Sequence, residues 1–94
     1  MHLKKEHTIE KPVSVYQLFH GEGITTSIQI IQGQELKAHS SKVPALLLCV
    51  QGEVVFENEN GVKELLKSGD YVHIEPLIKH WVLANVESQL ILLK

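Results

Sequence analysis

Short apolar runs separated by turn residues repeat along the whole chain. The turn residues are mostly Gly, Pro, Asn and Ser, and the runs between them are rich in Val, Ile, Leu and aromatic side chains. Runs of this length and spacing are typical of β-sandwiches and barrels, whereas no window of ten or more residues shows the 3.6-residue period of a helix. The pattern predicts an all-β fold without a substantial helix. Eight strands are expected, at 13–19, 24–32, 45–50, 53–57, 62–67, 71–75, 81–84 and 89–93.

One connection is predicted in more detail. Asn60 and Gly61 lie between an apolar run that ends near Phe56 and another at Leu65 and Leu66. Asn and Gly both tolerate the positive φ angles of a type I′ turn. The sequence therefore predicts a hairpin with a two-residue loop.

Residues 45–50 (ALLLCV) are apolar at every position, although successive strand side chains point to opposite faces. A small closed barrel fills its interior with one face only, so the other face must lie against a second sheet, a loop or another subunit. Residues 54–56 and 90–93 share this property. We therefore expect a homodimer with a sheet-to-sheet interface.

Composition limits the size of the domain. The chain has 94 residues, with 31 Leu, Ile and Val, only three Ala and no Arg. This length fits one domain, and a chain of this size must use most of its aliphatic side chains in the core. We expect a barrel domain over residues 12–94. Residues 1–11 are predicted to form an arm that is flexible or pairs with a neighbouring chain.

The charge pattern argues against two classes of partner. The formal net charge is −2 and the nine lysines are scattered, so no basic face is expected for nucleic acid. The first twelve residues are too polar for a signal peptide, and no apolar run approaches the length of a membrane span. The single cysteine, Cys49, excludes an internal disulfide and is compatible with a reducing compartment. A cytoplasmic protein that binds neither nucleic acid nor membrane is expected.

Candidate chemistry centres on histidine, which occurs six times. His39, His73 and His80 fall at positions associated with strands, and imidazole is the commonest ligand of transition metals. Gly33 precedes His39 by six residues and Gly52 follows it by thirteen. Gly69 is followed by a proline seven residues later and by His80 eleven residues later.

This arrangement resembles the two sequence motifs of the cupin superfamily. Residues 33–41 (GQELKAHSS), continued to Gly52, are similar to the first motif, and residues 69–80 (GDYVHIEPLIKH) are similar to the second. The resemblance covers residues 24–93. It implies a small jelly-roll β-barrel as a single domain.

The motifs depart from the family pattern at the metal ligands. In metal-binding cupins the ligands are two histidines and a glutamate of the first motif and one histidine of the second, and this chain keeps only His39 and His80. Ser41 replaces the second histidine, and Ala45 or Leu46 stands where the glutamate would be. The glycine that follows the proline of the second motif is replaced by Leu77 or Ile78, depending on the alignment.

Two imidazoles rarely hold a divalent ion, because catalytic sites normally have three protein ligands and water. Cys49 shares its parity with Leu47 and could face inward as a thiolate ligand, or it is simply a small buried apolar side chain. His73 is a second candidate, but Val72 and Ile74 are the natural inward pair and would turn it away. The remaining alternative for the two motif histidines is structural, with His39 at a strand edge and His80 capping a turn.

Two functions follow from this resemblance. The first is a stand-alone cupin without a full metal site, which binds a small, mostly apolar molecule or serves as a dimeric sensor or scaffold module. Its binding residues would be His39, Ser41, Leu47, Cys49, His80 and Val82. The second is a metal-dependent oxygenase, isomerase or lyase, in which a divalent transition metal is held by His39, His80 and a substitute third ligand.

Overall fold

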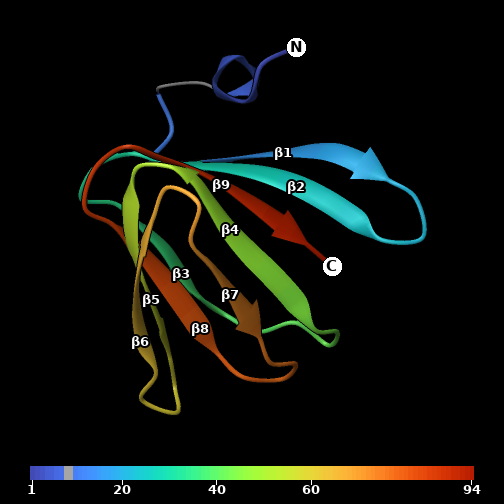
Figure 1. Ribbon diagram of the computed structural model, residues 1–94, viewed down its shortest axis with the longest axis vertical. Helices are drawn as coiled ribbons and strands as arrows, with labels where there is room; N and C mark the ends of the chain where they lie inside the picture. The colour runs from blue at the N-terminus through green and yellow to red at the C-terminus, as the bar shows by residue number, and fades with distance from the viewer. Residues whose placement is uncertain (8–9) are drawn as a thin grey trace.

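The computed structural model describes residues 1–7 and 10–94, and in this part of the chain nine strands form two antiparallel sheets (Figure 1). Sheet A contains, in spatial order, β1 (Val13–His20), β2 (Ile24–Ile30), β9 (Ser88–Leu93), β4 (Ala45–Gln51) and β7 (Tyr71–Ile74). Sheet B contains, in spatial order, β3 (Glu35–His39), β8 (His80–Ala84), β5 (Glu53–Asn58) and β6 (Lys63–Lys67). The predicted all-β jelly roll is confirmed.

The core lies between the inner faces of the two sheets. On β4, the side chains of Ala45, Leu47 and Cys49 are buried, while Leu46 and Leu48 between them are half-buried on the outer face of sheet A. The strands opposite and beside β4 supply the other buried apolar side chains: Ile28, Ile30, Val54, Phe56, Leu66, Ile74, Val82, Ala84 and Leu90. The run at 45–50, which is apolar at every position, therefore contributes only one of its two faces to the core.

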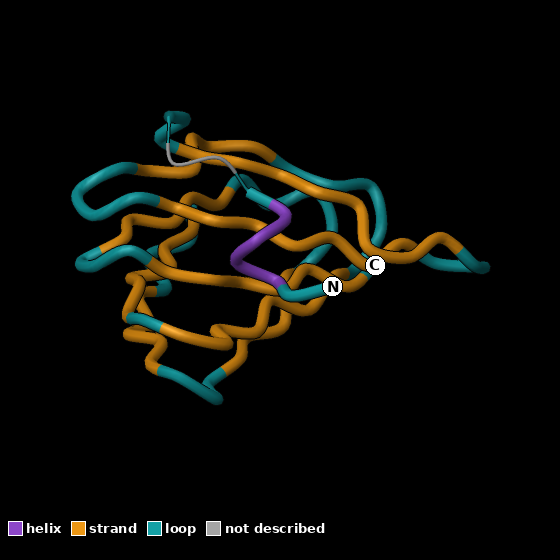
Figure 2. Tube along the Cα trace, turned by 90° about the horizontal axis from the view of Figure 1, so that it is seen from above, coloured by secondary structure: helices purple, strands orange, loops and turns teal. Residues whose placement is uncertain are grey.

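The two sheets do not close into a strict barrel, which corrects the closed barrel expected from the sequence. Strands β1 and β7 are the edges of sheet A, and β3 and β6 are the edges of sheet B. The far end of the β1–β2 hairpin extends beyond the two packed sheets, as Figures 1 and 2 show. Val15 and Phe19 on β1 are accordingly 60% and 65% exposed.

The sequence prediction of eight strands missed β3. This strand pairs with β8 through Glu35, Leu36 and His39, with an irregularity in register between Leu36 and His39. Leu36 packs against the core, whereas the other four side chains of β3 are exposed. A strand with one inward apolar residue gives no apolar run, so its sequence carries no strand signal.

The predicted two-residue hairpin turn is wrong. The last pair of the β5–β6 ladder is Glu57 and Lys63, and just beyond it Asn58 N–H donates to the carbonyl of Val62 at 3.1 Å, so that bond encloses three residues, 59–61. Gly61 has a φ of 85°, whereas Asn60 does not have a positive φ. A type I turn followed by a left-handed glycine is the usual three-residue hairpin. The Asn58 side-chain oxygen also accepts from the Asn60 and Val62 amides, which stabilises this longer loop.

The predicted arm at residues 1–11 has structure at its beginning. A short 3-10 helix, η1 (Leu3–Glu6), lies over the outer face of sheet A (Figure 2), and His7 follows it. Thr8 and Ile9 lie outside the described residues, so flexibility of the arm as a whole stays a prediction. The described part of the chain contains no helix long and apolar enough to cross a membrane.

Candidate functional site

The two histidines of the motifs meet at one end of the molecule. His39 is the last residue of β3, His80 is the first residue of β8, and the two are directly paired across the strands. Their ring centroids are 4.2 Å apart with an angle of 60° between the ring planes. The connections from β3 to β4 and from β7 to β8 cross between the sheets at this end. We call this end, where His39 and His80 lie, the mouth of the sandwich.

His80 is enclosed by apolar packing. It is 3% exposed, and its ring stacks on Phe56 of β5 with centroids 5.7 Å apart and an interplanar angle of 28°. Burial lowers the pKa of His80, and the charges of His39 and Lys94 lower it further, against an opposing hydrogen bond to the Ile78 carbonyl. His80 is therefore neutral at pH 7.

Both rings use Nδ1 for a hydrogen bond to a backbone carbonyl two residues earlier. His39 Nδ1 is 2.9 Å from the Lys37 oxygen, and His80 Nδ1 is 3.3 Å from the Ile78 oxygen. A carbonyl oxygen can only accept, so in the neutral ring Nδ1 carries the proton and Nε2 keeps a lone pair. Neither Nε2 has a hydrogen-bond partner among the described residues. Each ring at the mouth therefore has one acceptor atom, of which that of the exposed His39 is the more accessible.

A metal ion does not fit the donor set at the mouth. No group of three His, Cys, Asp or Glu side chains capable of holding a metal occurs among the described residues. The family glutamate is missing: of the two residues that could stand in its place, Ala45 is buried in the core and Leu46 is half-buried on the outer face of sheet A. Two imidazoles alone fall short of the three protein ligands that a catalytic site normally needs.

The two substitute ligands considered from the sequence lie elsewhere. His73 is exposed on the outer face of sheet A, beside Tyr71 at a centroid distance of 5.9 Å, so it points away from the core as expected. Cys49 does face inward, but it is fully buried. Burial raises the pKa of its thiol, and the charge of Asp70 raises it further. Cys49 is therefore a protonated thiol at neutral pH, in line with its structural reading.

Ser41 does not continue the strand of His39. Strand β3 ends at His39, and Ser41 lies in the following loop, where its hydroxyl accepts from the Val43 amide at 3.3 Å. Its carbonyl accepts from the amide of Leu77 at 2.8 Å. Ser41 therefore does not share a strand face with His39. Ser41 instead ties the loop after β3 to the loop before β8, and contact of its hydroxyl with a ligand stays a prediction.

The three apolar residues predicted to contact a ligand are packed within the core. Leu47, Cys49 and Val82 are 1%, 0% and 0% exposed. Side chains with so little accessible surface have no room for a ligand beside them unless the sheets separate. Of the six predicted binding residues, the structure brings His39 and His80 together at the mouth and places these three beneath it.

Sequence reasoning missed two groups near the histidines. Phe56 carries the stacking surface for His80, and the positive charge of Lys94 acts on His80 from the end of β9. The alternation of side chains along a strand could have predicted that Lys94 lies on the inward side, because it is two and four residues after the inward residues Leu92 and Leu90. The sequence identifies Phe56 only as an inward aromatic residue and does not predict its contact with His80.

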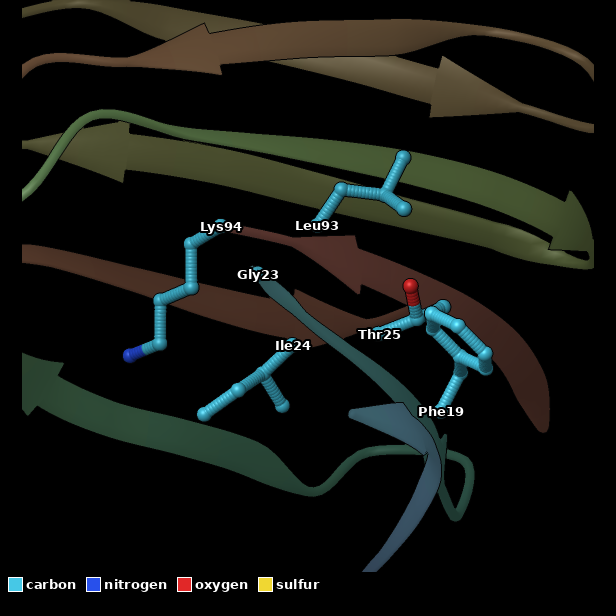
Figure 3. A pocket seen from close by; sticks show the side chains of 6 residues that line it. All are labelled: Phe19, Gly23, Ile24, Thr25, Leu93 and Lys94. Atoms are coloured by element: carbon cyan, nitrogen blue, oxygen red, sulfur yellow. The ribbon is translucent and has the colours of Figure 1, made fainter. Parts of the chain in front are cut away.

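A surface cavity of about 370 Å³ lies where β2 begins and β9 ends (Figure 3). Lys94 and Ile24 line one part of it, and Thr25 and Leu93 project on the other side of the strand pair. Phe19, from the projecting hairpin, lies beside Thr25 at one end of it. This cavity contains none of the predicted site residues, and Lys94 is its one charged residue.

Comparison with known proteins places the fold. No protein-family model matches the sequence, and no curated protein matches it significantly. Solved structures do match. A conserved protein of unknown function from Streptococcus pyogenes is 21% identical with a TM-score of 0.83, over 99% of this chain and 82% of that chain.

Two further structures carry the family name. A cupin superfamily protein from Desulfitobacterium hafniense is 16% identical with a TM-score of 0.80, over 87% of this chain and 75% of that chain. An RmlC-like cupin from Shewanella frigidimarina is 23% identical with a TM-score of 0.80, over 93% of this chain and 78% of that chain. Together with the paired motif histidines, these likenesses show that the chain has the cupin fold.

Proposed function

We propose that this cupin-fold chain binds a small, mostly apolar molecule at the mouth of the sandwich, without the help of a metal. The observation that carries the proposal is the His39–His80 pair, whose ring centroids are 4.2 Å apart and whose Nδ1 atoms are both used by backbone carbonyls, with no third metal donor among the described residues. Two acceptors next to an aromatic ring suit a ligand that has one hydroxyl or N–H group on an apolar body.

The surroundings of the pair support such a ligand. Phe56 backs His80, and within residues 1–7 and 10–94 no carboxylate joins the two imidazoles in a cluster. A hydroxyl donated to the Nε2 atom of His39 would replace a hydrogen bond to water. An apolar body that shields this hydrogen bond from water would add a hydrophobic contribution to the affinity.

The proposal is tested with a matched pair of probes, phenol and its methyl ether anisole, on untagged protein. Phenol should shift the imidazole NMR signals of His39 and His80 in a saturable way, whereas anisole, which has no donor, should bind more weakly. His39→Ala should abolish the difference between the probes, while His20→Gln, at an exposed histidine of β1, should preserve it. Equal binding of both probes to the wild-type protein would contradict the role of the two acceptors.

The same preparation tests the alternative, a metal-dependent enzyme using His39, His80 and a substitute ligand. We expect elemental analysis to find no stoichiometric transition metal. A stoichiometric metal that is lost in both His39→Ala and His80→Ala would overturn our proposal in favour of the enzyme.

We also propose that the chain forms a homodimer through the outer face of sheet A. The aliphatic residues Leu46, Leu48 and Ile91 lie half-buried on adjacent strands there, and the register places Leu48 between Ile91 of β9 and Tyr71 of β7. Leu93 and Tyr71 at the margin are 40% and 59% exposed. These neighbouring apolar side chains support burial against a second copy.

A further inference from the structure

The N-terminal segment, residues 1–7, is attached to the outer face of sheet A by one imidazole. His7 Nδ1 is 2.8 Å from the hydroxyl of Ser14 on β1, and His7 Nε2 is 2.7 Å from the hydroxyl of Ser27 on β2. Ser14 is 8% exposed and Ser27 is completely buried. Both ring nitrogens of a single side chain are thus bound to two neighbouring strands.

The rest of the segment is loosely packed. None of the residues of η1 is buried. A cavity of about 370 Å³ separates Leu3 and its neighbours from Val50 of β4, and one of about 280 Å³ separates them from Tyr16 of β1. In the part of the chain that the structure describes, the other tie is an ion pair of 3.2 Å between Lys4 and Glu87. Their side chains are 54% and 38% exposed, and exposed pairs of this kind contribute little. The hydrogen bonds of His7 therefore hold a segment that has few other contacts.

The surface beneath the segment is polar. Ser27, Gln29 and Gln89 lie on the outer face of sheet A and are at most 3% exposed. Gln89 Nε2 donates to Gln29 Oε1 at 2.6 Å, while Gln89 Oε1 is buried without a partner. If the segment left, water would reach these groups and satisfy Gln89 Oε1. Uncovering them costs less than uncovering an apolar surface of the same size.

The proton positions follow from the burial of the two serines. The hydroxyl proton of Ser27 has no access to water, so it needs His7 Nε2 as its acceptor. The imidazole proton is then on Nδ1 and is donated to Ser14, whose own hydroxyl retains some contact with solvent. A second proton on Nε2 would point at the Ser27 oxygen and leave the Ser27 hydroxyl proton without an acceptor.

Few charges compensate a protonated His7. Burial lowers the pKa of His7, and the only opposing effect is the charge of Glu6 on the same segment. Of the elements around the ring, β1 brings Ser14 and Tyr16 and β2 brings Ser27, while Lys4 and Lys5 add positive charge. Glu87, in the loop before β9, is already paired with Lys4.

We propose that His7 is a proton-sensitive latch, which holds residues 1–7 on sheet A when its ring is neutral and releases them when the ring gains a proton as the pH falls. Release opens the outer face of β1, β2 and β9, including the buried Gln89 amide, to solvent. The segment is therefore a strap whose closure depends on a single imidazole.

Hydrogen exchange on the full chain tests the latch through the strap amides of Lys5 and His7, which donate to the carbonyls of His2 and Lys4. After correction for intrinsic exchange, their protection should fall about ten-fold between pH 7.5 and 5.5, a change that the loss of one hydrogen bond to a buried group can produce. His7→Ala should have low protection at both pH values, and His20→Gln should behave as the wild type does. Amides of β5 serve as the control for global unfolding and should stay protected throughout.

Two results would overturn the proposal: equal strap protection at both pH values in the wild type, or wild-type protection in His7→Ala. The proton assignment is checked by the ¹⁵N shifts of the His7 ring, where a proton on Nε2 in the neutral form would contradict it. Ser27→Ala removes the hydroxyl that needs Nε2, so it should weaken the strap at pH 7.5 and reduce its pH dependence.

Discussion

At the scale of single residues, His80 and Leu77 show how the mouth departs from an ordinary strand connection. His80 is a titratable side chain buried against Phe56, and Leu77 has a φ of 66°, in the region that glycine favours. The cupin motif has a glycine near this position, with Leu77 and Ile78 as the two candidates to replace it. The backbone identifies Leu77 as the residue that adopts the glycine-like conformation.

Protonation of His80 should make stability depend on pH. Because burial lowers its pKa in the folded state, the unfolded chain binds a proton first as the pH falls below 6.5. The free energy of unfolding should therefore be highest above pH 6.5 and decline as the pH falls toward the lower pKa of the folded state. Urea unfolding at pH 7.5 and 5.5 measures the decline, and His80→Gln should reduce it. His20→Gln, at an exposed site, should leave it unchanged, and an equal decline in both variants would contradict the assignment to His80.

Replacing Leu77 should stabilise the protein. The left-handed conformation costs a side chain with a Cβ about 1–2 kcal/mol, and Leu77 is 70% exposed, so it loses little packing. Leu77→Gly should raise the free energy of unfolding by up to about 1 kcal/mol, because the greater flexibility of glycine in the unfolded chain offsets part of the gain. Thermal melting would show this, with Ile78→Gly as the destabilising control at the other candidate position.

At the scale of elements, the tight connection between β4 and β5 decides how the chain crosses from one sheet to the other. Gly52 has a φ of 106°, and a Cβ there would overlap the hydroxyl of Ser88 and lie within 2.8 Å of the Glu87 carbonyl oxygen. The same Ser88 hydroxyl accepts from the amide of Glu53 at 3.1 Å. The crossing from β4 to β5 therefore requires a residue without a side chain at position 52.

Two glycine substitutions separate backbone strain from lack of space. Gly61→Ala, in the β5–β6 loop, meets no atom within 4 Å, so it should cost only the strain of a positive φ, about 1 kcal/mol. Gly52→Ala has the same strain and also displaces Ser88, so its loss should be at least about 2 kcal/mol. Chemical denaturation compares the two, and a Gly52→Ala loss no larger than that of Gly61→Ala would show that the contact with Ser88 relaxes freely.

The elements also show what sequence patterns can predict. Dense aliphatic runs predicted the positions of β4, β5 and β9. In these strands the side chains that face the core are apolar, and several of those on the opposite face are apolar too. Strand β3 has one inward aliphatic residue, Leu36, and became visible only through its pairing with β8. The meeting of His39 and His80 could be expected only from motif spacing. The hydrogen bonds of His7 could not be predicted from the sequence. Ser14 and Ser27 are ordinary polar residues of two strands, and only the folded structure brings a distant segment over them.

At the scale of the whole molecule, the two faces of sheet A differ. The inner face is the core, while the outer face carries the N-terminal strap over β1, β2 and β9 and leaves Leu46 and Leu48 of β4 and Tyr71 of β7 partly open. A chain with net charge −2 has little electrostatic repulsion to oppose association through this face.

Association should therefore depend on Leu48. The wild-type protein is expected to sediment as a dimer at micromolar concentration, and Leu48→Lys should shift it to a monomer, because a lysine at the centre of the face would be buried without a partner. Leu83→Lys, at a 37% exposed residue of sheet B, is the matched control and should remain dimeric. A wild-type monomer at this concentration would remove the dimer proposal.

The burial of Cys49 gives the molecule a built-in chemical reporter. The chain has one thiol, which is fully buried and held in its unreactive protonated form. A thiol reagent in solution can modify it only when the two sheets part, so the rate of labelling counts those openings. Since Leu47 and Val82 can contact a ligand only in the same open state, a ligand that enters between the sheets would change the labelling rate, and one that stays at the mouth would leave it unaltered.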